Sequence, residues 1–148
     1  MTMSRQLPRL SRGEPAYGGP MTVARLRLGR RAEELVAASL ERQGAQIVAA
    51  NVRPAGVRGE IDLIALENGA LVFVEVKARS AGSVVGPETP LLALDRRKQL
   101  KLRRLAAAWL REAGDSAPSR RQIRFDVVGL RVDDAGHVVE WDHVRGAF

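Results

Sequence analysis

The sequence has no cysteine, few aromatic residues and no long apolar run. Without cysteine, the chain of 148 residues has neither disulfides nor thiolate metal ligands, which agrees with the reducing cytoplasm, where we expect the protein to act. Aromatic residues are only 4% of the chain, which disfavours a protein that stacks single-stranded bases on aromatic side chains. No apolar run approaches the roughly 18 residues of a membrane-spanning helix, so we expect no membrane partner.

Positive charge is in excess. The chain has 24 Lys and Arg against 17 Asp and Glu, a net charge of +7, and an isoelectric point of about 11.1. This balance favours a polyanionic partner, nucleic acid first. Residues 1–20 are rich in Arg, Pro and Gly and lack the apolar core of a signal peptide, so they are predicted to be a disordered basic tail. Residues 21–148 suit a single domain, and Met21 is a second candidate start of translation.

The Asn68-Gly69 dipeptide lies between two alternating apolar runs. It is the strongest short-range signal of a β-hairpin, because a type I′ turn needs positive φ at both central residues. With these two residues as the loop, Glu67 faces Ala70, and the register can be followed outward. It predicts two further facing pairs, Asp62 with Glu75 and Glu60 with Lys77.

One face of this hairpin is charged and the other is apolar. The apolar face is predicted to hold Ile61, Leu63, Ala65, Val72, Val74 and Val76. Facing carboxylates destabilise a sheet, and a divalent cation between Asp62 and Glu75 would remove that penalty. The alternative is a half-exposed hairpin whose charged face is simply solvated. Ile64 and Phe73 place apolar bulk on the charged face, so we expect the first helix, with Glu33 and Glu34, to cover it.

The remaining pattern predicts an α/β layered domain with a mixed sheet. Gly44 suits the end of the first helix. The second helix has a core-facing stripe of Leu102, Leu105, Ala106, Trp109 and Leu110. The expected helices are 25–43 and 91–113, the further strands 45–51, 122–132 and 137–144, and the loops 52–58, 80–90 (with Gly82 and Gly86) and 114–121.

Basic side chains gather on the second helix away from its apolar stripe. Contact with nucleic-acid phosphates and an ordinary solvated helix surface are both compatible with such a face. The residues predicted to bind nucleic acid are Arg96, Arg97, Lys98, Arg103 and Arg104.

Several motifs together resemble the YraN family of bacterial proteins. They are Gly29, Glu33, Leu40, Gly44 and Asn51, the runs 59–64 (GEIDLI) and 72–77 (VFVEVK), Lys98 with Gln99, Trp109 with Leu110, the run 124–128 (RFDVV), and Ala147 with Phe148. The resemblance covers about residues 25–148. It implies a restriction-endonuclease-like fold of the PD-(D/E)xK nuclease superfamily, in which a central mixed sheet is flanked by helices and whose members include archaeal Holliday junction resolvases.

The resemblance also implies catalytic roles. Asp62 and Glu75 would hold Mg²⁺ or Mn²⁺, with the Val76 carbonyl as a further ligand. Lys77 would position or activate the attacking water, and Glu33 would complete the acidic cluster. Ile61 stands where the superfamily name has proline, which leaves the chemistry intact.

The implied function is a metal-dependent nuclease that acts on DNA, with branched or damaged DNA as the resolvase-like substrate. Homodimers are common among resolvases, so a homodimer is an open expectation. Two alternatives are a nucleic-acid-binding module without turnover and a protein-interaction domain whose basic surface confers solubility. Phosphodiester hydrolysis needs a metal near the phosphoryl oxygens and a cation near the developing charge, which this set of residue types supplies.

Four polar residues near the C-terminus are predicted to be structural. His137 and His143 are expected at the surface or in the core, because lone histidines are weak motif evidence. Arg124 and Asp126 are expected to pair within the fold. Gln99 is a candidate to contact the site from the second helix.

Overall fold

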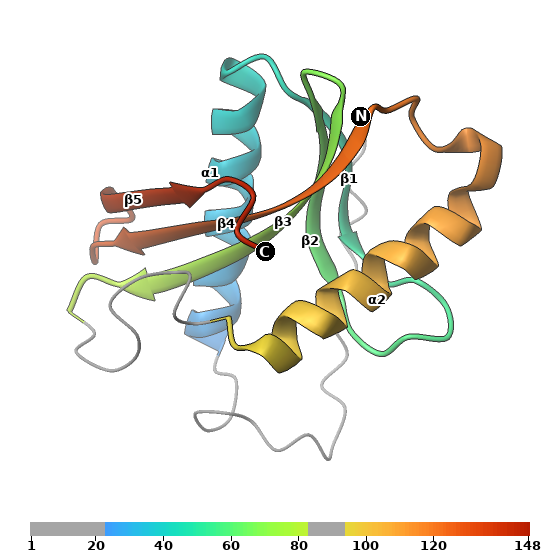
Figure 1. Ribbon diagram of the computed structural model, residues 1–148. Coiled ribbons are helices and arrows are strands. Elements are labelled where there is room, and N and C mark those ends of the chain that lie inside the picture. The colour runs from blue at the N-terminus through green and yellow to red at the C-terminus, as the bar shows by residue number, and fades with distance from the viewer. Residues whose placement is uncertain (1–22, 83–93) are drawn as a thin grey trace.

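A five-stranded sheet in the order β1-β2-β3-β4-β5 forms the centre of the structure (Figure 1). The computed structural model describes residues 23–82 and 94–148, so the predicted tail and Gly86 lie outside the described residues. The elements are α1 (Val23–Arg42), β1 (Gln46–Val52), β2 (Ile61–Glu67), β3 (Ala70–Ser80), α2 (Arg96–Ala113), the short 3₁₀ helix η2 (Gly114–Ser116), β4 (Gln122–Val132) and β5 (Val138–Val144).

The sheet is mixed. β3 and β4 pair in parallel, and the other neighbouring pairs are antiparallel. A parallel pair needs a long crossover between its strands, and α2 lies in this connection. The predicted α/β, restriction-endonuclease-like architecture with a central mixed sheet and flanking helices is confirmed. In the described part of the chain, neither helix is long and apolar enough to cross a membrane.

The turn between β2 and β3 has the predicted geometry. Asn68 and Gly69 both have positive φ, 51° and 81°, as a type I′ turn requires. The predicted register is confirmed from Glu67–Ala70 to Leu63–Val74, where the ladder between the two strands ends. The two predicted facing pairs Asp62–Glu75 and Glu60–Lys77 both lie beyond this last rung, so neither forms part of the ladder. Glu60 precedes β2 and follows Gly59, whose φ of 131° turns the chain.

Each face of the sheet carries one helix (Figure 1). An apolar core lies under each helix. On the first face, α1 packs against Leu63, Ala65, Val72 and Val74, together with Val128 and Leu130 of β4. On the second face, α2 packs through Leu105 and Ala106 on a cluster that includes Ile61, Ile64, Leu71, Phe73 and Phe125. The expectation that the first helix covers Ile64 and Phe73 is therefore wrong: the parallel crossover brings α2 to that face.

Ile61 also departs from the predicted alternation. It joins Ile64 and Phe73 in the core under α2, not Leu63 in the core under α1. Ile61 pairs with Val52 of β1, beyond the last rung that joins β2 to β3. Asn51, just before Val52, has a φ of 52°, and this left-handed residue turns the end of the strand pair.

The helix ends follow their capping residues. Gly44, with a φ of 96°, ends α1 as predicted, and the Ala45 N–H donates to the Leu40 carbonyl. α2 begins at Arg96 and not at residue 91, because Asp95 is its N-cap and accepts a hydrogen bond from the Lys98 N–H at 2.9 Å.

Candidate active site

Acidic side chains converge where β2 and β3 separate. Oxygen atoms of Glu33 from α1, Glu60 before β2 and Asp62 in β2 all lie within 4.8 Å of one another, and the three residues are partly buried. Glu75 of β3 joins them electrostatically, since its charge raises the pKa of both Asp62 and Glu33. A set of carboxylate oxygens of this kind suits a hard divalent cation such as Mg²⁺ or Mn²⁺.

Asp62 is fixed by the end of the β2–β3 ladder. Its Oδ2 accepts a hydrogen bond of 2.8 Å from the Val76 N–H, in place of the backbone acceptor that a continued ladder would supply. Burial, followed by the charge of Glu75, raises the pKa of Asp62 well above its ordinary value, while the Val76 N–H and Lys77 act in the opposite direction. A positive charge beside Asp62 would therefore strongly stabilise the ionised form of this carboxyl.

Glu33 is held between α1 and β1. Burial and then the charge of Glu60 raise the pKa of Glu33 to about 7, although a hydrogen bond with the Asn51 side chain and the charge of Arg30 lower it in part. The register of β1 and β2 places Asn51 across from Asp62. The backbone of Asn51 is left-handed, a conformation that asparagine adopts more readily than most residues.

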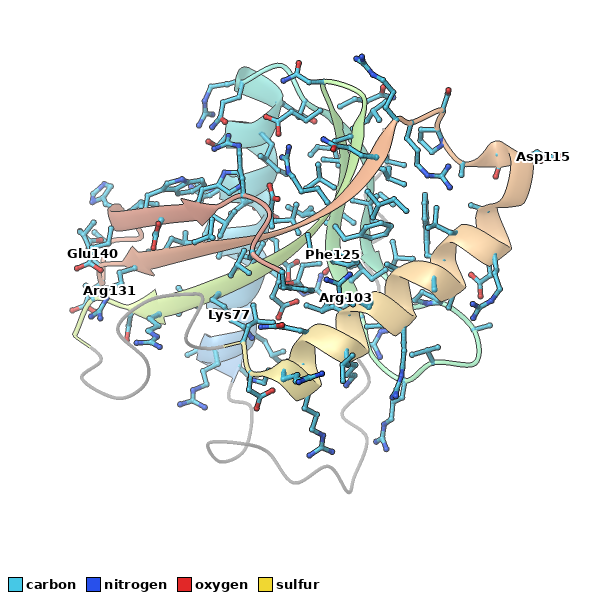
Figure 2. The ribbon with its side chains drawn as sticks, viewed as in Figure 1. Lys77, Arg103, Asp115, Phe125, Arg131 and Glu140 are labelled. Atoms are coloured by element: carbon cyan, nitrogen blue, oxygen red, sulfur yellow. The ribbon has the colours of Figure 1, made fainter. Side chains whose placement is uncertain are left out.

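Glu75 and Lys77 lie on the same face of β3 as Phe73. The Lys77 Nζ is 3.0 Å from the Glu75 Oε1, and both side chains are partly buried. In Figure 2, Lys77 lies toward the first turn of α2. The site thus brings together the predicted residues Glu33, Asp62, Glu75 and Lys77. Val76 contacts this site through its N–H, which bonds Asp62, and the role of its carbonyl as a metal ligand stays a prediction.

Gly59 and Glu60 complete the entrance to β2. A Cβ at Gly59 would lie 2.8 Å from Cε of Lys101, so the aliphatic part of the lysine crosses this glycine closely. Arg53 holds Glu60 through its Nε and Nη2, each 3.0 Å from Oε2. The sequence prediction did not place Glu60 in the site and gave Asn51 no role. Glu60 comes two residues before Asp62, and this spacing indicates that the two side chains share a face of the strand.

The basic residues predicted on α2 are all exposed, namely Arg96, Arg97, Lys98, Arg103 and Arg104. At about 100° per helical residue, Arg96, Arg97, Arg103 and Arg104 share one side of α2, as predicted, whereas Lys98 lies off this side. Arg103 lies over the rings of Phe125 and Phe148. The Gln99 side chain donates to the Leu94 carbonyl at 3.2 Å, a bond that holds it at the start of the helix.

A second polar cluster lies on the α1 face, near the hairpin turn. Asp126 is 1% exposed and accepts hydrogen bonds from Arg124, His143 and the Gly146 N–H. Burial is the strongest influence on this carboxyl and opposes its charge, but these hydrogen bonds together lower its pKa to about 2. Arg124 also bonds Glu67 of β2.

The structural interpretation of these C-terminal residues is confirmed. Arg124 and Asp126 pair within the fold, and the His143 side chain is buried against Asp126. His137 lies before β5, with its side chain 78% exposed and its Nδ1 3.4 Å from Asp133.

The raised pKa of Glu33 predicts a stability that depends on pH. The pKa of Glu33 is about 7 in the folded chain and 4.5 in its ordinary state. As the pH falls, Glu33 is therefore protonated in the folded protein before it is protonated in the unfolded protein. This contribution to stability is complete below about pH 4.5 and is lost as the pH rises through 7. With divalent cations removed, urea unfolding should therefore give about 1 kcal/mol more stability at pH 5 than at pH 8, allowing for solvent screening of the carboxyl.

Glu33→Gln should make this profile less steep and raise the stability at pH 8, while Asp62, whose pKa is also raised, keeps part of the slope. The matched control is Glu34→Gln, since Glu34 is the next residue, is half exposed and pairs with Arg31 at the surface. Asp126 does not act in this window, because its lowered pKa makes its contribution fall only below about pH 4. A profile as steep in Glu33→Gln as in the wild type would show that Glu33 is not the group that titrates.

Comparison with known proteins identifies the family. Residues 32–130 match the model of the uncharacterised protein family UPF0102. A UPF0102 protein of Moorella thermoacetica is 38% identical over 86% of this chain and 100% of its own length. Relatives from Rhodococcus opacus and Halorhodospira halophila are 42% and 44% identical, over 83% and 81% of this chain and 97% and 85% of their own lengths. With a family match over most of the chain and several relatives of nearly the same extent, the chain belongs to UPF0102, the YraN family.

Proposed function

We propose that the protein is a divalent-metal-dependent nuclease that hydrolyses phosphodiester bonds in DNA. The observation that carries the proposal is the convergence of Asp62, Glu75 and Lys77, with Glu33 contributed by a separate helix. Clustered carboxylates raise one another's pKa and destabilise the site, so their placement together fits a role as cation ligands better than a role in the fold.

Each side chain has a part in this reaction. Asp62 and Glu75, with the Val76 carbonyl, would hold Mg²⁺ or Mn²⁺, and Glu33 and Glu60 would add negative charge on the α1 side. The bound ion would supply Lewis-acid polarisation of the phosphate and a lower pKa for water. Glu75 positions the Lys77 ammonium group at 3.0 Å, where it would stabilise the negative charge that develops on the phosphate as water attacks.

The positive charge of α2 supports DNA as the substrate. The helix carries seven Lys and Arg and a single Glu, and it covers the sheet face that holds Glu75 and Lys77. Branched or damaged DNA is the substrate form that we propose, in keeping with the resemblance to resolvases. A four-way junction has two-fold symmetry, which a homodimer would match.

The test is cleavage of linear, nicked, flapped and four-way DNA with Mg²⁺ or Mn²⁺. We expect wild-type protein to cut at least one substrate, EDTA to stop the reaction, and Lys77→Ala to slow it on the order of 10²-fold. Cleavage that persists in both Asp62→Ala and Lys77→Ala would come from a contaminant. Binding without cleavage of every substrate would favour the binding module instead, and neither binding nor cleavage would favour the protein-interaction domain.

A further inference from the structure

Arg103 differs from the other basic residues of α2 in how its charge is held. Its guanidinium carbon lies 5.0 Å from the centre of the Phe125 ring and 5.3 Å from that of Phe148. The two rings are themselves stacked, with centroids 5.0 Å apart and planes at 23°. A guanidinium placed over ring faces gains cation–π attraction and loses rotational freedom before any ligand arrives.

The aromatic residues place Arg103 on the same sheet face as the candidate active site. Phe125 pairs with Phe73 across β3 and β4, and their rings stack at 5.6 Å. Glu75 follows Phe73 by two residues on the same face, roughly 7 Å along the strand. The stacked rings of Phe125 and Phe73 therefore lie between the Arg103 guanidinium and Glu75, the carboxylate that pairs with Lys77.

The geometry points to Arg103 as the residue that binds a backbone phosphate of the cleaved strand, next to the phosphate under attack, an inference that rests on the nuclease function proposed above. Phe125 and Phe148 orient its guanidinium, which can donate two parallel hydrogen bonds to one phosphate. Holding this planar group in advance lowers the ordering cost of binding. The remaining basic residues of α2 contribute general electrostatic attraction to DNA.

The first experiment compares Arg103→Ala with Arg111→Ala, which removes the same charge from an exposed position of the same helix. Fluorescence anisotropy with a DNA duplex and no divalent cation gives the affinity at several salt concentrations. Arg103→Ala should reduce the slope of log affinity against log salt by about 0.9, the value for one lost phosphate contact, and Arg111→Ala should reduce it by less. Single-turnover cleavage at saturating DNA should fall about tenfold or more in Arg103→Ala only.

The second experiment tests the orientation of the guanidinium. Phe148→Leu keeps an apolar side chain but removes the ring under Arg103, so affinity should fall about two- to fivefold, the equivalent of an exposed cation–π contact. In the double variant with Arg103→Ala, the loss should be no greater than in Arg103→Ala alone. Arg103→Lys keeps the charge and should recover the salt slope without recovering the full cleavage rate.

The outcomes separate this inference from the proposed function. If wild type cleaves DNA and Arg103→Ala behaves as Arg111→Ala in both assays, the role of Arg103 is wrong and the nuclease function stands. If wild type binds but never cleaves, the nuclease function is wrong, and the salt slopes alone confirm or overturn the phosphate contact. Additive losses in the double variant would overturn the orientation by Phe148, and equal binding by all variants would overturn the phosphate contact.

Discussion

We expect Asp62→Asn to lose DNA cleavage on the order of 10³-fold while remaining at least as stable as the wild type without metal. The amide oxygen can still accept the Val76 N–H, so the end of the β2–β3 ladder keeps its bond. The substitution also removes a carboxylate whose pKa is raised by burial and by Glu75, and so relieves charge repulsion at pH 8. Loss of activity with unchanged or greater stability is typical of a functional acidic residue.

Cleavage rates and urea unfolding at pH 8 test this prediction together. Asp142→Asn is the matched control, because it makes the same change at an exposed position of β5 and should alter neither quantity. An Asp62→Asn variant that cleaved DNA like wild type would remove Asp62 from the mechanism. A variant that lost its stability would show that the carboxylate serves the fold.

The largest effect on stability should follow Asp126→Ala. We expect a loss of about 3–5 kcal/mol in the free energy of unfolding, because the variant leaves the Arg124 guanidinium and the His143 ring without their shared buried partner. It also leaves the Gly146 N–H without its acceptor, 3.0 Å away in the native chain. Such a loss is a large part of the stability of a domain of this size.

Urea unfolding of Asp126→Ala, beside the exposed Asp134→Ala, measures this loss. The control should remain within about 0.5 kcal/mol of wild type. DNA binding per folded molecule should survive in Asp126→Ala, since this network lies on the α1 face and not under α2. A loss below about 1 kcal/mol would mean that the buried network contributes little net stability.

The hairpin could be predicted from the sequence because its signals are local. Asn68 and Gly69 define the turn, and the alternation of side chains from Leu63 onward defines the two faces. Which helix packs on each face could not be predicted from local signals. The choice between α1 and α2 depends on the parallel crossover from β3 to β4, a long-range property that local periodicity does not contain.

The residues of the candidate site also differ in whether local sequence signals predict them. Asp62, Glu75 and Lys77 follow from one hairpin, whereas Glu33 needed the resemblance to a family, because it comes from a helix far away in the sequence. Asn51 could not be given a role because its side chain meets Glu33, which a separate helix brings to the site. The contact between Arg124 and Glu67 likewise joins residues 57 positions apart.

Calorimetric titration with Mn²⁺ tests the proposed cation site most directly. We predict that wild type and Asp142→Asn bind the ion alike at pH 8, and that Asp62→Asn and Glu75→Gln bind it at least about tenfold more weakly, since each loses one of the charged oxygen ligands. The readout does not depend on the choice of DNA substrate. Mn²⁺ binding by Asp62→Asn with the affinity of wild type would contradict a metal centre at the open end of this hairpin.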